Sequence, residues 1–170
     1  MKKSTVWLIP AIMLVGLGFS QASFAKQGDV SVDAGFKLGT SPCCGFGIGF
    51  GGGVGAGYEV LDNLQVRGDF NYLTWSKSGV DYDRILFGGA GRYYVAVMNN
   101  LKVYGQAGME ISVDKGTVAG FSSTTAHFGA PIALGAEFAV TPNIGIEGQA
   151  AFHLVTDSYL TFGVNGVYHF

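Results

Sequence analysis

The stretch DVSVDAGFKLG, from Asp29 to Gly39, alternates apolar residues with polar or small ones along its whole length. Successive side chains of a β-strand point to opposite sides, so this pattern predicts a strand with two different faces. The valines, Phe36 and their apolar neighbours would form one face, whereas Asp33 and Lys37 would lie on the other. The sequence therefore predicts a strand that separates an apolar from a polar environment.

The same period of two residues recurs along the rest of the chain, in segments separated by turn residues. The predicted strands are 29–39, 46–60, 64–75, 84–97, 101–113, 125–140, 144–155 and 159–170. Three-residue turns alternate with outer connections, which are predicted at 39–45, 76–83, 114–124 and 156–158. Eight strands joined in this way predict an all-β chain that closes into an antiparallel up-and-down barrel.

The first 25 residues have the pattern of an export signal. Two lysines precede an apolar run from Val6 to Phe19, and Ser23 and Ala25 supply the small residues of a cleavage site. A single membrane anchor is the alternative, but the run is shorter than the roughly 20 apolar residues that a spanning helix needs. We therefore predict a cleavable signal peptide over 1–25 and one barrel domain over 26–170.

The composition excludes several classes of protein. Charged residues make up 13% of the chain, which is low for a soluble domain, and 28 of the 170 residues are glycine. An apolar share of 48% is too high for a disordered chain, and the glycines lack the period of collagen. The formal net charge of −2 does not suit nucleic-acid binding, which needs a basic surface.

The alternating pattern leaves open which face of the barrel points inward. A soluble barrel would present a polar outer face rich in lysine and glutamate, but in the second segment that face consists of glycines from Gly45 to Gly57. Small residues suit a crowded interior, so the apolar face would point outward to lipid. The segment lengths agree, because a membrane-spanning strand has about 9–11 residues. The sequence therefore predicts a transmembrane β-barrel.

The end of the chain carries the most specific feature. Apolar, small and aromatic residues occupy one face up to a terminal aromatic residue, at Phe162, Val164, Gly166, Tyr168 and Phe170. With this ending, the chain resembles the small eight-stranded outer-membrane β-barrels of Gram-negative bacteria, of the outer membrane protein A/X and opacity-protein type. The resemblance implies that these five residues form the signal read by the outer-membrane assembly machinery. It also implies an outer-membrane location, with periplasmic chaperones, outer-membrane lipids and lipopolysaccharide as partners.

The inward-facing residues predict a lumen plugged by paired charges. An eight-stranded barrel is only wide enough to be filled by its own side chains. Acidic and basic residues both occur at the predicted inward positions. These residues are Asp33, Lys37, Glu59, Arg67, Asp69, Arg84, Arg92, Lys102, Glu110, Glu137 and Glu147.

The turns predict which inward residues face one another. A register that pairs Val60 with Leu64 places Gly57 opposite Arg67, so that glycine makes room for a large partner. A slot for an acyl chain or a small apolar solute is the alternative for this glycine stripe.

A second predicted register, across the turn at 141–143, places Glu137 opposite Glu147. Such a like-charge pair needs a neighbouring cation, for which Lys102 is the candidate, or a proton on one carboxyl group.

Two histidines, His127 and His153, are predicted to face inward near the outer ends of their strands. The assumed register brings Asp157 opposite His127, and such a contact could serve as a general base. The His-x-Ser pattern of a lipid A deacylase is absent, since Val155 and not serine stands two positions after His153. The histidines also lack the spacing of metal ligands, so we predict no metal or cofactor.

Two cysteines, Cys43 and Cys44, lie in the first outer connection. An exported protein with two cysteines suggests a disulfide, but adjacent cysteines can join only through a strained ring. A local loop lock and free thiols both remain open.

These features predict an integral outer-membrane protein without catalysis, with a role in envelope integrity or surface contact. A narrow channel for small or apolar solutes is the alternative, and a lipid-modifying enzyme is the second alternative. Analogy of fold does not choose among them, because function depends on the site.

Overall fold

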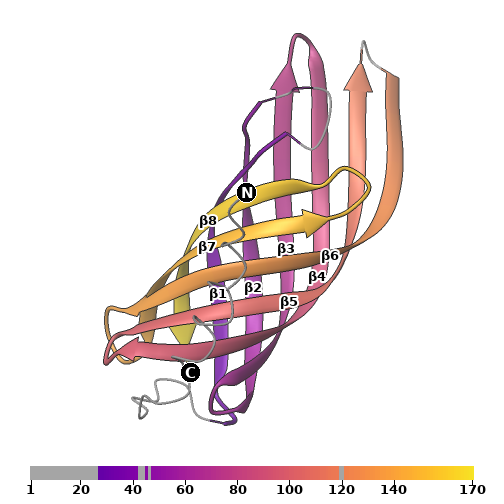
Figure 1. The fold of residues 1–170 in the computed structure, drawn as a ribbon. Coiled ribbons are helices and arrows are strands. Elements are labelled where there is room, and N and C mark those ends of the chain that lie inside the picture. The colour runs from indigo at the N-terminus through magenta and orange to yellow at the C-terminus, as the bar shows by residue number, and fades with distance from the viewer. Residues whose placement is uncertain (1–26, 42–44, 46, 119–120) are drawn as a thin grey trace, which may run out of the picture.

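The protein forms a closed barrel of eight antiparallel strands (Figure 1). The structure is a computed structural model that describes residues 27–41, 45, 47–118 and 121–170. Each strand pairs with the next along the chain, and β8 closes the barrel by pairing with β1. The strands are β1 Val30–Gly39, β2 Gly49–Leu61, β3 Leu64–Lys77, β4 Val80–Met98, β5 Leu101–Val118, β6 Phe121–Ala139, β7 Ile144–Leu154 and β8 Tyr159–His169. The predicted fold class is confirmed.

Two hairpins, β3–β4 and β5–β6, project beyond the other strands at one end of the barrel (Figure 1). The outer connections predicted at 76–83 and 114–124 are therefore wrong, because most of these residues continue the strands. In β3–β4 the turn needs only Ser78 and Gly79, which have φ values of 53° and 79°. Two successive residues with positive φ form the tight turn that suits the twist of a hairpin.

The second predicted strand also begins at the wrong residue. It was expected from residue 46, but β2 begins at Gly49. Gly45 and Gly47 have φ values of 67° and 90°, and a strand cannot continue through such conformations. The glycines before β2 thus form the connection, whereas the later ones form the strand.

The register between β2 and β3 agrees with the prediction over most of its length. Gly57 lies opposite Arg67, which is confirmed. The predicted pairing of Val60 with Leu64 is wrong, because Leu61 pairs with Leu64 and the register shifts just before that pair. A bulge absorbs the extra residue without moving the side chains of the remaining strand to the other face.

The outward side chains form an apolar band around the barrel, as expected for a lipid-facing surface. Aromatic residues gather toward both ends of this band, where a bilayer meets water. The aromatic residues near the strand ends toward the projecting hairpins include Phe36, Phe50 and Phe152, and those near the opposite strand ends include Tyr58, Tyr93, Phe138 and Tyr168.

The residues of the predicted assembly signal lie on this outward face. Phe162, Val164, Tyr168 and Phe170 are exposed, and the rings of Tyr168 and Phe170 pack edge to face with centroids 4.9 Å apart. Gly166 follows the same phase of β8. The five residues therefore form one continuous stripe, and their recognition by the assembly machinery stays a prediction.

Candidate functional site: the barrel lumen

The inner face of the barrel carries the charged residues of the chain's membrane-spanning part. The structure places every predicted lumen residue on this face, from Asp33 on β1 to Glu147 on β7. Most of them are buried. Buried charges are costly unless they are paired and hydrogen-bonded, so the partners of each group decide what the lumen can do.

Arg67 joins two aspartates near the middle of the lumen. Its Nη2 atom lies 2.8 Å from Asp33 Oδ2, and its Nε atom lies 2.9 Å from Asp69 Oδ1. This cluster occupies the space above the glycine stripe of β2, since a Cβ atom at Gly55 would collide with the Arg67 guanidinium. Side chains from neighbouring strands thus fill the stripe, in agreement with the packing interpretation.

Arg92 forms the central ion pair of the lumen. Its Nη1 atom lies 2.5 Å from Glu147 Oε2, and Glu147 Oε1 accepts a hydrogen bond of 2.9 Å from Asn165. The guanidinium also donates to Gln106 and stacks over the Tyr104 ring, 3.8 Å from its centroid. These contacts come from β4, β5, β7 and β8, so this layer spans the lumen.

The pairing of Glu137 with Glu147 across β6 and β7 is confirmed. Lys102, the predicted neighbouring cation, interacts electrostatically with Glu137, and each carboxylate also has a partner of its own. Glu147 takes its cation from Arg92, and Glu137 Oε1 lies 2.6 Å from His169 Nε2. Lys102 lies opposite Glu137 in the register, with its Nζ atom 5.2 Å from the Tyr94 ring centroid.

Glu59 lies at the same end of the lumen as His169. Its Oε1 atom accepts a hydrogen bond of 2.9 Å from Gln65, which also donates to Ser31. Gln65 and Ser31 are inward residues that sequence reasoning did not single out, although both follow the alternating pattern.

Arg84 and Asp114 form the ion pair at the outer end of the lumen. Arg84 Nε and Nη2 lie 2.6 and 2.7 Å from the two carboxylate oxygens of Asp114. The guanidinium also stacks over Tyr159, 4.6 Å from the ring centroid. Asp114 is not among the predicted lumen residues, because the fifth strand is predicted to end one residue earlier. Continued alternation from Ser112 through Asp114 was the available signal.

An apolar cluster fills the lumen beside this ion pair. It consists of Leu73, Trp75, Leu86 and Tyr159, with Tyr82 and Val155 packed against it. The Trp75 indole donates a hydrogen bond of 3.3 Å to the Gly39 carbonyl, and its ring takes the place of a side chain at Gly49. The lumen is therefore plugged at this level by packing rather than by charge.

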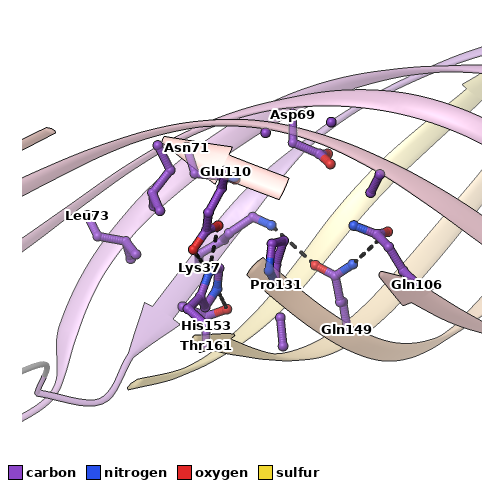
Figure 2. A pocket seen from close by; sticks show the side chains of 15 residues that line it. Lys37, Asp69, Asn71, Leu73, Gln106, Glu110, Pro131, Gln149, His153 and Thr161 are labelled. Carbon is purple, nitrogen blue, oxygen red and sulfur yellow. Dashed lines mark hydrogen bonds and ion pairs between the residues drawn. The ribbon is translucent and has the colours of Figure 1, made fainter. Parts of the chain in front are cut away.

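A small cavity with a mixed polar and apolar lining lies between the Arg92 layer and the apolar cluster (Figure 2). The space open to the centres of water molecules is ≈ 30 Å³, enough for about two of them. Lys37 points into the cavity and donates a hydrogen bond of 3.4 Å to Gln149 (Figure 2). The lining includes Glu110, His153 and Thr161.

His153 lies between a carboxylate and a hydroxyl group. Its Nδ1 atom is 2.9 Å from both oxygens of Glu110, and its Nε2 atom is 3.0 Å from Thr161 Oγ1. This order matches a general-base relay, in which a carboxylate orients an imidazole next to a hydroxyl. All three side chains are buried inside the barrel, however.

The partner predicted for His127 is wrong. His127 Nε2 lies 3.6 Å from Asp114 Oδ2, and its Nδ1 lies 3.2 Å from Thr156 Oγ1, so neither contact involves Asp157. The ladder between β6 and β7 ends at Ala130, and the chain beyond it no longer follows the extrapolated register.

Cys43 and Cys44 lie outside the described residues, so their pairing stays a prediction. Within the described part of the chain, no group of three histidine, cysteine or acidic residues could hold a metal ion. No helix among those residues is long and apolar enough to cross a membrane.

The model of a family described as outer membrane protein beta-barrel domain matches residues 10–170. No curated protein matches the chain. Ail, the attachment invasion locus protein of Yersinia pestis, is 18% identical with a TM-score of 0.64, over 85% of this chain and 99% of that one. The N-terminal β-barrel domain of Pseudomonas aeruginosa OprF is 17% identical with a TM-score of 0.66, over 86% and 100%. Neisserial surface protein A is 20% identical with a TM-score of 0.66, over 84% and 96%.

The low identities to these solved structures show a shared fold. The family match carries the assignment, because it spans nearly the whole chain and includes all eight strands. This protein therefore belongs to the outer membrane protein β-barrel domain family and resides in the outer membrane.

Proposed function

We propose that this protein is a non-catalytic structural component of the outer membrane, with a role in envelope integrity and surface contact. The projecting hairpins β3–β4 and β5–β6, together with the outer connections 39–45 and 156–158, would make the surface contacts (Figure 1). Lipopolysaccharide and outer-membrane lipids would surround the apolar band. Export would use a signal peptide over 1–25.

The filled lumen is the observation that carries this proposal. The layer around Arg92 and Glu147 blocks one level, and the cluster around Trp75 blocks another. The cavity between them has a volume of ≈ 30 Å³, which leaves room for only about two water molecules. A channel for solutes needs a continuous open path, which these two levels would interrupt.

Ion conductance in a planar bilayer tests the sealed lumen. The folded protein is expected to give no single-channel steps, because paired side chains occupy the path. Arg67→Met and Arg92→Met variants serve as comparisons, since each removes one charge from the lumen. Steady steps in the unmodified protein whose size changes in either variant would contradict the sealed lumen and favour the narrow channel.

The burial of the histidine relay supports a role without catalysis. His153 and Thr161 are 6% and 4% exposed, so a bulky lipid substrate would not reach them. Mass spectrometry of envelope lipids from cells with and without the protein tests this part. Identical acyl composition is expected, and a lipid species that depends on His153 would instead identify an enzyme.

The role in envelope integrity has its own test. Cells that lack the protein are expected to become more sensitive to detergents, and the Arg92→Met/Glu147→Met variant should restore resistance if it folds. Unchanged sensitivity in cells without the protein would remove the support for this role.

A further inference from the structure

Two histidines in the outer half of the lumen, His153 and His127, each link β5 to a residue that follows β7 in the chain. His153 joins Glu110 of β5 to Thr161 of β8, through contacts of 2.9 and 3.0 Å. His153 lies on β7, next to β8, and β6 alone separates it from β5, so this link runs along the inner wall of the barrel across β6. Figure 2 shows Glu110, His153 and Thr161 meeting at one side of the cavity.

His127 makes a similar but weaker link from Asp114 of β5 to Thr156, which follows β7. Its distance to the carboxylate is 3.6 Å, and its side chain is 24% exposed. Arg84 already binds both oxygens of Asp114. A proton on His127 would therefore add little to a carboxylate that is already neutralised.

Glu110 binds no such second cation within the part of the chain that the structure describes. Among the described residues, its carboxylate forms hydrogen bonds with His153 alone. Several charged or titratable groups face His153 or the cavity beside it. They are Lys37 of β1, Asp69 of β3, Arg84 of β4, Glu110 of β5 and Tyr159 of β8, with Arg84 stacked over the Tyr159 ring. The residues that β6 and β7 contribute to the lining beside His153 include Pro131 and Gln149, which carry no charge.

The His153 ring also contacts the apolar cluster that plugs the outer lumen. It stacks on Tyr159 with centroids 4.5 Å apart and an interplanar angle of 9°. Tyr159 in turn packs edge to face against Trp75, with centroids 6.1 Å apart. One aromatic ring therefore separates the histidine from the tryptophan.

We propose that His153 is a pH-responsive latch, which fastens the outer end of β7 and β8 to β5 and thereby holds the aromatic plug in place. The protonated imidazole donates through both nitrogens, to Glu110 and to Thr161. A charge-assisted hydrogen bond is about twice as strong as a neutral one. The charge-assisted bond exists only while the imidazole carries its second proton, so acid tightens the latch and alkali loosens it.

Trp75 provides a direct readout of this latch. The chain contains two tryptophans, so the full chain carrying Trp7→Phe has Trp75 as its only one. The protein is folded into phospholipid vesicles, and acrylamide quenching of Trp75 is measured across about pH 5 to 8.5. The quenching constant is expected to rise about twofold along a single sigmoid as pH increases, because the weaker hydrogen bond loosens the plug.

Variants in the same background identify the histidine responsible. His153→Gln is expected to give a flat profile, because glutamine keeps a polar side chain but takes up no proton. His127→Gln is the matched control, and its sigmoid should persist. A flat profile in the parent protein, or a sigmoid that persists in His153→Gln, would overturn the latch.

A second variant covers the case in which His153→Gln does not fold. Glu110→Gln preserves the size of the partner and removes its charge, so the sigmoid should shrink while the Trp75 emission maximum stays native. NMR titration of the His153 ring in the parent protein is expected to coincide with the quenching curve. A full sigmoid in Glu110→Gln, or a ring titration that does not coincide, would overturn the proposal. The proposed latch does not depend on whether the lumen conducts ions, so failure of the sealed-lumen proposal would leave this test unaffected.

Discussion

Single residues in the lumen are constrained because each charge depends on a specific partner. Arg92 and Glu147 are 2% and 0% exposed in their side chains and lie 55 positions apart in the chain. Removal of one member leaves the other as an uncompensated buried charge, whereas removal of both leaves none. The lumen is thus sensitive to the loss of one partner and more tolerant of the loss of both.

We expect Arg92→Met to lower the free energy of unfolding by about 3–5 kcal/mol, since Glu147 then lacks its cation. The double variant Arg92→Met/Glu147→Met should recover most of this loss. Guanidinium unfolding of the protein in vesicles measures both values. A double variant no more stable than the single one would show that the guanidinium matters through its other contacts.

The inward glycines are constrained by close packing rather than by charge. A Cβ atom at Gly51 would collide with the backbone carbonyl of Tyr72, whereas one at the outward Gly91 would meet nothing within 4 Å. We expect Gly51→Ala to destabilise the barrel by about 1–3 kcal/mol through overpacking, and Gly91→Ala to have little effect. Chemical unfolding of the matched pair checks this expectation, and equal midpoints would contradict it.

At the scale of an element, the outer hairpins depend on tight turns. The β3–β4 turn holds both Ser78 and Gly79 at positive φ, a conformation that side chains with a branched Cβ rarely adopt. The backbone therefore tolerates glycine and asparagine at these positions and resists most other residues. Turn chemistry explains why β3 and β4 continue up to the turn at Ser78 and Gly79, beyond the predicted strand ends at 75 and 84.

Gly79→Val should open the tip of this hairpin, because the left-handed conformation costs an ordinary residue about 1–2 kcal/mol. Ser78→Asn should close it further, since asparagine followed by glycine favours this turn. Limited trypsin digestion after Lys77 reports the opening. Cleavage should be faster in Gly79→Val and slower in Ser78→Asn, and the same rate in all three proteins would refute the role of the turn.

The end of β8 provides a prediction about assembly. Phe170 is 69% exposed, so its loss should cost the folded barrel little. Phe170→Ala is expected to reduce the amount of protein in the outer membrane of cells while refolding in detergent stays normal. Phe128→Ala is the matched control, because Phe128 of β6 is 68% exposed and lies outside the predicted signal. An equal reduction in both variants would show that exposed aromatic area, not the signal, matters.

At the scale of the whole molecule, closure of the sheet decides which residues meet. Pairing of β1 with β8 joins the two ends of the chain, and every strand then contributes inward side chains to one lumen. The layers around Arg92, the cavity and Trp75 each combine residues from strands that are distant in sequence. Filling of the lumen is therefore a property of the closed barrel and not of any hairpin.

Much of the architecture was predictable because it is local. The period of two residues identified all eight strands and the face of each predicted lumen residue, from Asp33 to Glu147. Register near a short turn was also predictable, as Gly57 with Arg67 and Glu137 with Glu147 demonstrate. Strand ends were less accurate, because the extent of β3 depends on the conformation of the turn at Ser78.

By itself the sequence determined the alternation, the strand order and the two faces of the barrel, since each follows from residues close together along the chain. The tertiary structure decided the partners across the lumen. It gave Glu137 to His169 and Glu147 to Arg92, with Lys102 opposite Glu137 in the register. These contacts depend on the depth and direction of side chains from strands that are not neighbours in the sheet, and they form only when the barrel closes.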